Sequence, residues 1–401
     1  MDKTALFEEC LKHKISTDTR NINKGDVFIA LKGDNFDGNS YCDQALEQGA
    51  AMCISDSSTN LKKENIHVVP DGLTFLQELA NHKRKKLEIP VIGITGSNGK
   101  TTNKELIHAV LSKKYRTSAT KGNLNNHIGV PLTLLDISND TEISIVEMGA
   151  NQPNDIIELA EIAEPTYGLI TNIGAAHLEG FGNLQGVLTT KKQLFDFIER
   201  NVENTIVFNA DDPIVADIVP NVRNFSFVKN EELKIESVRA TPFLEFQYSY
   251  NDYSSPILQT NLIGDYNINN FMAAVSFGIL FNVSMEKINQ ALIEYTPSNN
   301  RSQLTKTDRN QLIVDCYNAN PTSMQAAVKN MIGIDHAEKI CILGDMLELG
   351  SESQKEHKRI IELISEYNLD TYFVGNEFMK VSNNSKCFHN TEELLEQLNL
   401  N

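Results

Sequence analysis

A glycine-rich segment carries the clearest chemical signal in the sequence. It reads G-I-T-G-S-N-G-K-T-T from Gly93 to Thr102, between an apolar run and a helix-like pattern. Backbone N–H groups of such a turn, with the N-terminus of the next helix, can hold phosphate oxygens. A lysine there places positive charge near the β- and γ-phosphates, and a threonine hydroxyl can bind Mg²⁺. The segment predicts a nucleotide-phosphate loop made of Gly96, Ser97, Asn98, Gly99, Lys100, Thr101 and Thr102.

The match to the general phosphate-loop pattern is imperfect. The pattern G-x-x-x-x-G-K-[ST] needs a glycine where Ile94 stands, and Gly93 and Gly96 flank that position. The alternative is an ordinary glycine turn that happens to precede Lys-Thr. The strand-like run before the turn and the helical pattern after it both favour the phosphate loop.

Two further side chains stand where a metal ligand is expected. Glu147 ends the strand-like run 143–147, and His177 follows the strand-like run 167–173 in T-N-I-G-A-A-H-L-E-G-F-G. Ligands of open α/β sheets bind at the carboxyl ends of the strands, and a metal takes carboxylate or neutral imidazole. Taken alone, a strand-end glutamate is more often structural or solvated, and a loop histidine is more often simply hydrogen-bonded. The residues themselves therefore indicate an ATP-binding enzyme with a Mg²⁺ site, and no more.

Two clusters of cations have a plain interpretation. Lys191 and Lys192 lie on a helical pattern, where a lysine pair is usually a solvated face. The basic run 82–86 closes an amphipathic helix over 73–87, and we expect a solvated helix end there.

The elements that must position these residues alternate between strand and helix patterns. This alternation predicts an α/β fold with mostly parallel sheets and right-handed crossovers. We expect three α/β units in series, over residues 1–88, 89–296 and 297–401. The strands predicted in the second and third units cover 91–95, 143–147, 167–173, 205–209, 311–315, 339–343 and 371–374.

Composition and charge exclude some classes of function. The 401 residues are 41% hydrophobic and 22% charged, with a net charge of -17, which disfavours nucleic acid or an anionic membrane as partner. No run approaches the ~18 apolar residues of a membrane helix, and the N-terminus lacks the apolar core of a secretion signal. The six cysteines show no C-x-x-C spacing. We expect a cytoplasmic protein, a monomer, with buried free thiols.

The phosphate loop and three other blocks together resemble the Mur ligase family. The loop T-G-S-N-G-K-T-T is the form used by that family and the related folylpolyglutamate synthases, in which the first glycine is also missing. K-G-N-L-N-N-H-I-G-V-P-L-T-L-L, over 121–135, resembles the family's second block. E-M-G-A at 147–150 resembles the block with a magnesium-binding glutamate, and the block around His177 resembles the one with a histidine ligand.

Further blocks resemble one type within the family, which adds D-alanyl-D-alanine to UDP-N-acetylmuramoyl-tripeptide. Asn299-Asn300-Arg301 precedes D-C-Y-N-A-N-P at 315–321, and L-G-D-M-L-E-L-G follows at 343–350. Near the N-terminus, S-T-D-T-R at 16–20 and A-L-K-G-D-N-F-D-G-N at 30–39 resemble the UDP-sugar-binding domain of that type.

The resemblance implies three domains and a reaction. It implies a UDP-precursor-binding domain, a central P-loop ATP-binding domain and a Rossmann-like C-terminal domain that contacts acceptor and nucleotide, with the boundaries given above. The reaction is ATP-driven amide synthesis through an acyl phosphate, with ADP and phosphate as products and two Mg²⁺ ions as cofactors, in peptidoglycan precursor synthesis. The substrates are UDP-N-acetylmuramoyl-tripeptide and D-alanyl-D-alanine.

The resemblance also implies roles for single residues. Thr101 and Glu147 would hold one Mg²⁺, and His177 with a carbamate on Lys191 would hold the second. Lys100, Lys191 and His177 form the implied catalytic set. Nucleotide contacts are implied for the phosphate loop and for Asn267, Asn270, Arg301 and Asp315.

Two departures from the family pattern leave alternatives open. The family's Lys-x-Lys-x-Glu stands here as Thr189 to Gln193, which places the carbamylated lysine at Lys191, with Lys192 as the other register. The family's C-terminal lysine-glycine-serine-arginine segment is not seen, so we expect a shortened third domain. The alternatives are another Mur ligase or a folylpolyglutamate synthase-like ligase, or a non-catalytic relative that binds nucleotide or UDP-precursor. An assay of amino-acid against dipeptide acceptors separates the ligase types.

Overall fold

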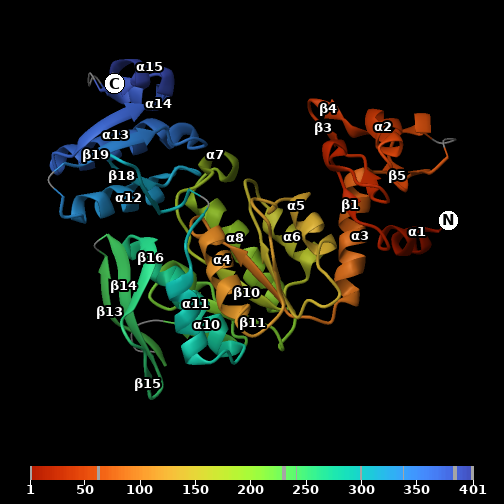
Figure 1. Cartoon of the computed structure of the whole chain (residues 1–401), viewed down its shortest axis with the longest axis horizontal. Helices are drawn as coiled ribbons and strands as arrows, with labels where there is room; N and C mark the ends of the chain where they lie inside the picture. Colours follow the sequence, from red (N-terminus) through yellow and green to blue (C-terminus); the bar gives the residue numbers. More distant parts are fainter. Residues whose placement is uncertain are drawn as a thin grey trace. The chain divides into compact units, whose positions relative to one another are not determined.

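A computed structural model describes residues 2–60, 64–227, 232–240, 242–298, 300–336, 338–382 and 386–398. The chain is a mixed α/β protein with parallel sheets, which confirms the predicted fold class. It divides into two compact units, each built from several stretches of sequence. Figure 1 labels the helices and strands described below. The first unit comprises Met1–Gly93, Tyr115–Gly149 and Asp155–Tyr167, and the second comprises Ile94–Lys114, Ala150–Asn154 and Gly168–Asn401.

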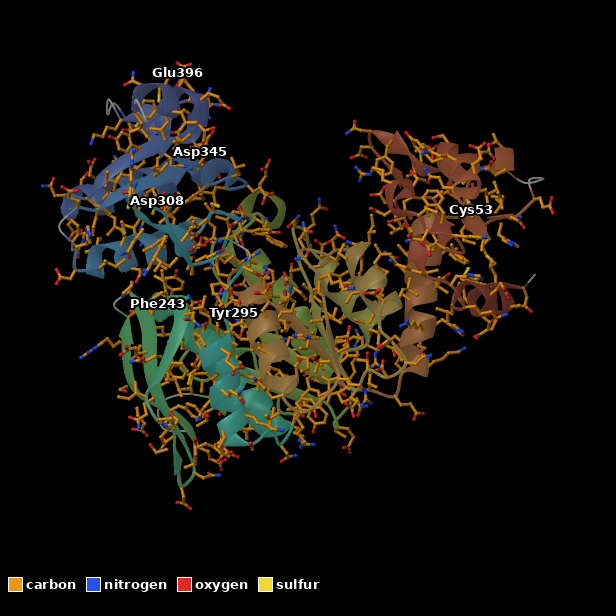
Figure 2. The ribbon with its side chains drawn as sticks, viewed as in Figure 1. Cys53, Phe243, Tyr295, Asp308, Asp345 and Glu396 are labelled. Carbon is orange, nitrogen blue, oxygen red and sulfur yellow. The ribbon has the colours of Figure 1, made fainter. Side chains whose placement is uncertain are left out.

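The N-terminal part of the first unit is a small parallel sheet with helices packed on it. The sheet has the order β1-β2-β5-β6, and each neighbouring pair is parallel. Apolar side chains of β2 and β5 pack against Phe75, Leu76 and Leu79 on one face of α3, because helical spacing brings these three positions together. Cys53, labelled in Figure 2, is buried on β5. The elements are α1 (Lys3–Cys10), β1 (Ile15–Ser16), β2 (Val27–Ile29), β3 (Lys32–Gly33), β4 (Phe36–Asp37), α2 (Cys42–Glu47), β5 (Met52–Ser55), β6 (Ile66–Val68) and α3 (Gly72–Lys86).

The basic end of α3 is partly buried, so the prediction of a solvated helix end is wrong for two of its residues. Arg84 is 6% exposed, and its guanidinium donates hydrogen bonds of 2.9 Å to the carbonyl oxygens of Ala163 and Glu164. Lys83 donates to the carbonyl oxygen of Leu135 at 2.8 Å. These carbonyls close α6 and α5, where the last turn of a helix leaves acceptors without intrahelical donors. The two cations therefore fasten α3 to the ends of both helices.

The largest sheet has six strands, in the order β12-β11-β10-β7-β9-β8. Every residue of β7 (VIGIT) and β9 (ISIVE) is buried, as the largely apolar sequences of the two strands favour. Three of its predicted strands, β7, β9 and β11, have the predicted bounds, whereas β10 ends three residues before the predicted end. The elements are β7 (Val91–Thr95), β8 (Thr117–Ala119), α5 (Gly129–Leu135), β9 (Ile143–Glu147), α6 (Asp155–Ala163), β10 (Tyr167–Ile170), β11 (Thr205–Asn209) and β12 (Asn224–Phe227).

Two helices of the second unit pack against α4, the helix that follows the phosphate loop, and an antiparallel sheet packs against one of them. The apolar helix α10 packs on α4, and α11 packs on both α4 and β16. Tyr295, which follows α11, donates a 2.6 Å hydrogen bond from its hydroxyl to Glu105 of α4 (Figure 2). The elements are α4 (Lys100–Leu111), α7 (Leu178–Phe181), α8 (Leu184–Ile198), α9 (Pro213–Asp217), β13 (Leu233–Ala240), β14 (Phe243–Tyr250), β15 (Tyr253–Ser254), β16 (Leu258–Ile263), α10 (Ile268–Leu280) and α11 (Met285–Glu294).

The C-terminal part of the second unit contains a parallel three-stranded sheet of order β19-β20-β21 and a separate hairpin of β17 and β18. The predicted strands in this part lie within one residue of β18, β19 and β20. Cys316 is exposed, so the prediction of buried thiols is wrong there. No helix of the described residues is long and apolar enough to cross a membrane. The elements are β17 (Gln303–Lys306), β18 (Gln311–Val314), α12 (Pro321–Gly333), β19 (Ile340–Gly344), α13 (Ser353–Glu366), β20 (Asp370–Val374), α14 (Asn376–Val381), β21 (Cys387–Phe388) and α15 (Thr391–Leu398).

Candidate active site

The glycine-rich loop between β7 and α4 has the shape of a phosphate cradle. Gly96 and Gly99 have φ angles of 146° and 78°, which side chains rarely tolerate. A Cβ atom on Gly96 would lie 1.8 Å from the Thr171 hydroxyl oxygen, and one on Gly99 would lie 2.8 Å from Oδ1 of Asn270. Only bare backbone fits at both places. Lys100 begins α4, and its Nζ donates a 2.8 Å hydrogen bond to the carbonyl oxygen of Gly96.

The segment that follows β10 holds this loop in place. The backbone N–H of Ser97 donates to the carbonyl oxygen of Asn172 at 3.0 Å, and that of Asn98 donates to Oδ1 of Asn172 at 3.1 Å. In return, the Thr171 hydroxyl donates to the carbonyl oxygen of Asn98 at 2.6 Å. The block that carries His177 thus also sets the conformation of the phosphate loop.

The two asparagines that resemblance assigns to nucleotide contacts support the loop through a chain of amides. Asn267 is 3% exposed and accepts a 2.7 Å hydrogen bond from Nδ2 of Asn270. Asn270 accepts a 2.6 Å bond from Nδ2 of Asn103, which also donates to the carbonyl oxygen of Gly99 at 2.9 Å. The chain of amides ties the start of α10 to the start of α4.

His177 faces the C-terminal block L-G-D-M-L-E-L-G. Its φ angle is 52°, and its Nδ1 is hydrogen-bonded to a carboxylate oxygen of Glu348. Burial lowers the pKa of His177 below its ordinary value, the Glu348 carboxylate acts in the opposite direction, and the charges of Lys100 and Lys191 lower it further. The second unit thus brings Lys100, His177 and Lys191 into one electrostatic neighbourhood.

The lysine pair on α8 does not form one solvated face. Lys191 is 1% exposed, and its Nζ lies 5.9 Å from the ring centre of Phe181. Lys192 forms an ion pair with Asp196 one turn further along the helix, and its side chain is 37% exposed. The prediction that both lysines lie on a solvated helix face is therefore wrong for Lys191 and holds for Lys192.

Glu147 lies in the first unit at the buried end of β9. It is 2% exposed, its backbone N–H donates to the Thr120 hydroxyl at 2.9 Å, and its carboxylate accepts a 2.9 Å bond from Nδ2 of Asn125. Asn125 belongs to the block 121–135, so that block orients the glutamate. Thr101, at the start of α4 in the second unit, is 6% exposed.

A cavity of about 340 Å³ lies within the first unit. The S-T-D-T-R segment lines one part of it through Ser16, Thr17 and Asp18, and the block 121–135 lines another part through Lys121 and Thr133. Hydroxyls, a carboxylate and an ammonium therefore surround a space large enough for part of a polar ligand.

Arg301 and Asp315 lie close together at the start of the C-terminal part. The guanidinium carbon of Arg301 lies 3.9 Å from the ring centre of Tyr317. Its Nε is buried and has no hydrogen-bond partner among the described residues. Asp315 as a whole residue is exposed, but burial of its carboxyl raises the pKa of that group above its ordinary value. The backbone N–H of Ser302 and the charge of Arg301 act in the opposite direction and lower this pKa. Asn299, the first residue of this motif, lies outside the described residues.

Residues that the sequence did not single out complete the C-terminal side of the site. Asn320 of D-C-Y-N-A-N-P hydrogen-bonds to Asn98 in the phosphate loop, at 2.6 Å. Glu348 was passed over as well, although both residues lie inside motifs that were recognised. Only the fold shows that these motifs reach the phosphate loop and the histidine.

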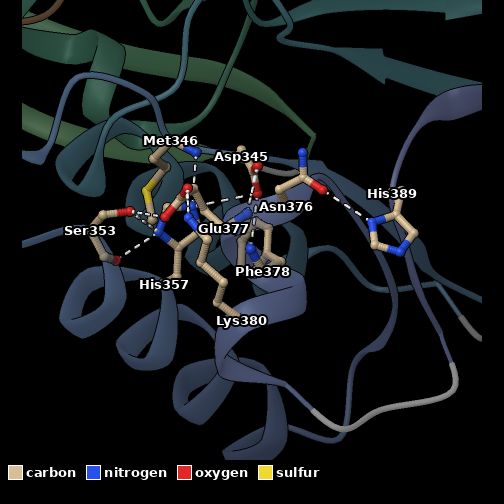
Figure 3. A network of polar contacts seen from close by, with 9 residues as sticks. All are labelled: Asp345, Met346, Ser353, His357, Asn376, Glu377, Phe378, Lys380 and His389. Atoms are coloured by element: carbon tan, nitrogen blue, oxygen red, sulfur yellow. Dashed lines mark hydrogen bonds and ion pairs between the residues drawn. The ribbon is translucent and has the colours of Figure 1, made fainter.

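A buried network holds the second of these motifs (Figure 3). Asp345 accepts the backbone N–H groups of Glu377 and Phe378 at 2.9 and 3.0 Å, and thus caps the start of α14. The backbone N–H of Met346 donates to Nε2 of His357 at 3.0 Å, and the imidazole is 0% exposed. These bonds fix the backbone just before Glu348.

The side chains that could bind a metal here suit an ion that takes most of its ligands from water and phosphate. In the described ranges, no three or more histidine, cysteine, aspartate or glutamate side chains gather into a metal site. Mg²⁺ keeps several waters and binds phosphates with one or two protein ligands, so sparse oxygen and imidazole donors beside a phosphate cradle fit it.

Three family models match consecutive parts of the chain. The Mur ligase family catalytic domain matches residues 12–104, the Mur ligase middle domain matches 94–278, and the Mur ligase glutamate ligase domain matches 300–397. The chain is 35% identical to the UDP-N-acetylmuramoyl-tripeptide–D-alanyl-D-alanine ligase of Bacillus subtilis, over 92% of this chain and 80% of that protein. It is 32% identical to the ligase of the same name from Escherichia coli, over 89% and 79%.

Solved structures give the same result. The crystal structure of MurF from Acinetobacter baumannii matches with a TM-score of 0.88 and 30% identity, over 96% of this chain and 86% of that one. MurF from Thermotoga maritima in complex with ADP matches with a TM-score of 0.86 and 26% identity, over 97% and 91%. A folylpolyglutamate synthase from Mycobacterium tuberculosis, at 12% identity and a TM-score of 0.66 over 81% of this chain and 86% of that one, shares the fold.

Proposed function

This chain belongs to the Mur ligase family, and we propose as its function the reaction for which its relatives are named. It is an ATP-dependent ligase that joins D-alanyl-D-alanine to UDP-N-acetylmuramoyl-tripeptide, with ADP and phosphate as products, in peptidoglycan precursor synthesis. One observation carries the choice of type within the family. The chain is 35% identical to a ligase named for this reaction, over 92% of this chain and 80% of that protein. The block D-C-Y-N-A-N-P, which resembles this type, bonds to the phosphate loop through Asn320 and Asn98.

The loop and its lysine bind ATP and neutralise charge during phosphoryl transfer. Backbone N–H groups at the N-terminus of α4, from Gly99 onward, hold the phosphates, since those of Ser97 and Asn98 are bonded to Asn172. The ammonium of Lys100, which bonds to the carbonyl of Gly96, moves to the β- and γ-phosphates when ATP binds. This charge matters because the attacking carboxylate and the phosphate are both anions.

The chemistry proceeds in two displacements. The terminal carboxylate of the tripeptide attacks the γ-phosphorus, and the bond to the β–γ bridging oxygen breaks, so ADP leaves. The acyl phosphate then meets the amine of D-alanyl-D-alanine, which attacks the acyl carbon. An amide bond forms, phosphate leaves with the bonding pair, and the amine loses a proton.

The metal ligands are part of the proposal. Thr101 and Glu147 are each proposed as a Mg²⁺ ligand, and His177 with a carbamate on Lys191 is proposed to hold a second ion. Bound Mg²⁺ would supply Lewis-acid stabilisation of the negative charge that develops on the phosphate oxygens. A carbamate forms when a neutral amine adds to carbon dioxide and releases a proton. Because Lys191 is 1% exposed and close to other cations, conversion to an anion also removes a buried positive charge.

The remaining assignments follow from the same proposal. The cavity beside the S-T-D-T-R segment is proposed to take part of the UDP-linked precursor. Nucleotide contacts are proposed for Arg301, whose buried Nε lacks a partner in the described structure, and for Asp315. The domain boundaries at 88 and 296, the monomeric state and the cytoplasmic location stay predictions.

Phosphate release tests this function directly. The complete mixture contains UDP-N-acetylmuramoyl-tripeptide, ATP, Mg²⁺ and D-alanyl-D-alanine, and each component is omitted in turn. We expect phosphate release only when all are present, and a product heavier than the tripeptide by one dipeptide residue. Equal release with a single amino acid would assign the chain to another Mur type, and no release with either acceptor would favour a binding protein.

A further inference from the structure

We propose that Glu348 is a positioning residue for His177. Its carboxylate accepts a hydrogen bond from the Nδ1–H group of the imidazole, and this bond directs the lone pair on Nε2 to the metal. This inference rests on the proposed ligase function, because that function supplies the metal. The geometry that carries it is the hydrogen bond between Nδ1 of His177 and a carboxylate oxygen of Glu348. The two residues are 171 positions apart in sequence and belong to separate blocks of the second unit.

Both residues have backbone conformations that cost free energy. His177 has a φ of 52° and Glu348 a φ of 61°, in the left-handed region that is uncommon for residues other than glycine, although histidine enters it more often than glutamate does. Such strain persists only where the surrounding structure determines it, and it concentrates at functional sites. His177 is the residue immediately before α7, and Glu348 lies in the bend that precedes the short helix Gly350–Glu352.

The two turns are also joined through their backbones. The N–H of Glu179 donates a 3.1 Å hydrogen bond to the carbonyl oxygen of Glu348. A Cβ atom on Gly350, whose φ is 53°, would lie 3.7 Å from Cα of Glu179, so the turns are in close contact. The pairing of His177 with Glu348 is therefore built into a docked pair of turns, and does not depend on two long side chains that happen to meet.

The network in Figure 3 fixes the turn that presents Glu348. His357 receives the N–H of Met346 at Nε2, at 3.0 Å, and its Nδ1 lies 2.7 Å from the carbonyl oxygen of Ser353. Both bonds need the tautomer with the proton on Nδ1, because Nε2 must accept and Nδ1 must donate. Leu349, on the other side of Glu348, is 2% exposed. The chain is thus anchored on both sides of the glutamate.

The consequence for His177 is chemical. An ionised carboxylate only accepts hydrogen bonds, so the His177 proton lies on Nδ1 and the lone pair lies on Nε2. A metal ligand needs that lone pair, and a carboxylate partner on the other nitrogen fixes ring orientation and raises ligand basicity. Since the side chain of Glu348 is 51% exposed, its ion-pair contribution to stability is small, and its role is orientation.

The test compares Glu348→Ala with Glu352→Ala. Glu352 lies four residues further along, and its carboxylate pairs with Lys355 at 2.8 Å, away from the histidine. One readout is the ¹⁵N shifts of the His177 ring, assigned with His177→Gln. The other is Mn²⁺ binding to the protein–ADP complex, measured by electron paramagnetic resonance. We expect Glu348→Ala to populate the tautomer with the proton on Nε2 and to weaken Mn²⁺ binding about 10- to 100-fold. Glu352→Ala should change neither.

Each outcome decides the proposal. If Glu348→Ala matches Glu352→Ala in both readouts, the proposal is wrong; if the tautomer changes while Mn²⁺ affinity does not, the metal-directing role is wrong. Glu348→Gln, which keeps an acceptor oxygen but lacks the charge, should fall between wild type and Glu348→Ala. Thermal unfolding of all variants shows that they are folded. Neither readout uses the peptide substrates, so failure of the ligase assay would leave this test intact.

Discussion

Asn320, the first residue before α12, donates its side-chain amide to Oδ1 of Asn98 in the phosphate loop, over 2.6 Å. The same side chain accepts the N–H of Ser323 at 3.0 Å and so caps the helix. One residue therefore joins the start of α12 to the loop that we propose binds ATP. Its two functions can be separated by substitution, because a shorter side chain can cap the helix without reaching the loop.

We predict that Asn320→Ser raises the KM for ATP about tenfold. Serine replaces asparagine well as a helix cap but cannot reach Asn98, so the loop loses one partner. An unpaired buried polar group costs about 1–3 kcal/mol, and about 1.4 kcal/mol corresponds to a factor of ten. Steady-state kinetics with ATP varied and both other substrates saturating measures the effect.

The matched control is Asn318→Ala in the same motif. Asn318 is exposed and hydrogen-bonds to the backbone N–H of its neighbour Ala319, so its removal should leave the KM for ATP unchanged. Asn320→Ala should raise the KM as Asn320→Ser does, and also lower the melting temperature, since the cap is lost. A KM for Asn320→Ser equal to that of wild type would show that the contact does not support ATP binding.

A second prediction concerns Lys100. Lys100→Ala should abolish ligation while the fold is retained, because the β- and γ-phosphates lose their neutralising ammonium. The control is Lys113→Ala, which removes a charge just beyond the same helix, where Lys113 pairs with Glu294. Turnover is measured by phosphate release and folding by circular dichroism. Near-normal turnover of Lys100→Ala would contradict the phosphate-loop assignment.

The fold was predictable from sequence where local pattern and burial agree. β7 and β9 are buried on both faces, and their short, mainly apolar and β-branched runs predicted their bounds. The antiparallel sheet from β13 to β16 was not foreseen, because mixed sequences such as that of β13, with most residues exposed, lack a strict alternation.

The candidate site was predictable only in part, because residues whose roles depend on contacts between distant parts of the sequence could not be recognised. Lys100 and His177 lie in motifs whose residue types point to chemistry. The roles of Asn320 and Glu348 depend on contacts across 222 and 171 positions. Burial of Arg84 is equally invisible in a basic run, because its partners are backbone carbonyls and carry no sequence signal.

The third prediction tests that buried cation. Arg84→Ala should destabilise the protein by roughly 3 kcal/mol, because charge-assisted hydrogen bonds are lost and the carbonyls of Ala163 and Glu164 stay buried without donors. Lys85→Ala is the control: Lys85 is the neighbouring cation, its side chain is 62% exposed, and its 3.5 Å ion pair with Glu164 contributes at most about 1 kcal/mol. Urea denaturation compares the midpoints. Equal midpoints for the two variants would mean that Arg84 is dispensable.

The last prediction separates the two registers of the carbamylated lysine. Lys191→Ala should lose most activity, because an oxygen ligand of the second Mg²⁺ is lost. An unmodified ammonium could not replace it, since it has no lone pair and repels the metal. A short carboxylic acid such as acetate, added to the assay, should partly restore activity to Lys191→Ala by occupying the space of the carbamate. Lys192→Ala should retain near wild-type turnover, because Lys192 pairs with Asp196 and adjacent helical residues point about 100° apart. Phosphate release with and without acetate measures both variants at saturating Mg²⁺.

Bicarbonate depletion gives an independent check, since it should lower wild-type activity and leave the acetate-rescued Lys191→Ala unaffected. Loss of activity in Lys192→Ala alone would move the ligand to the other register, and failure of acetate to rescue Lys191→Ala would argue against the carbamate.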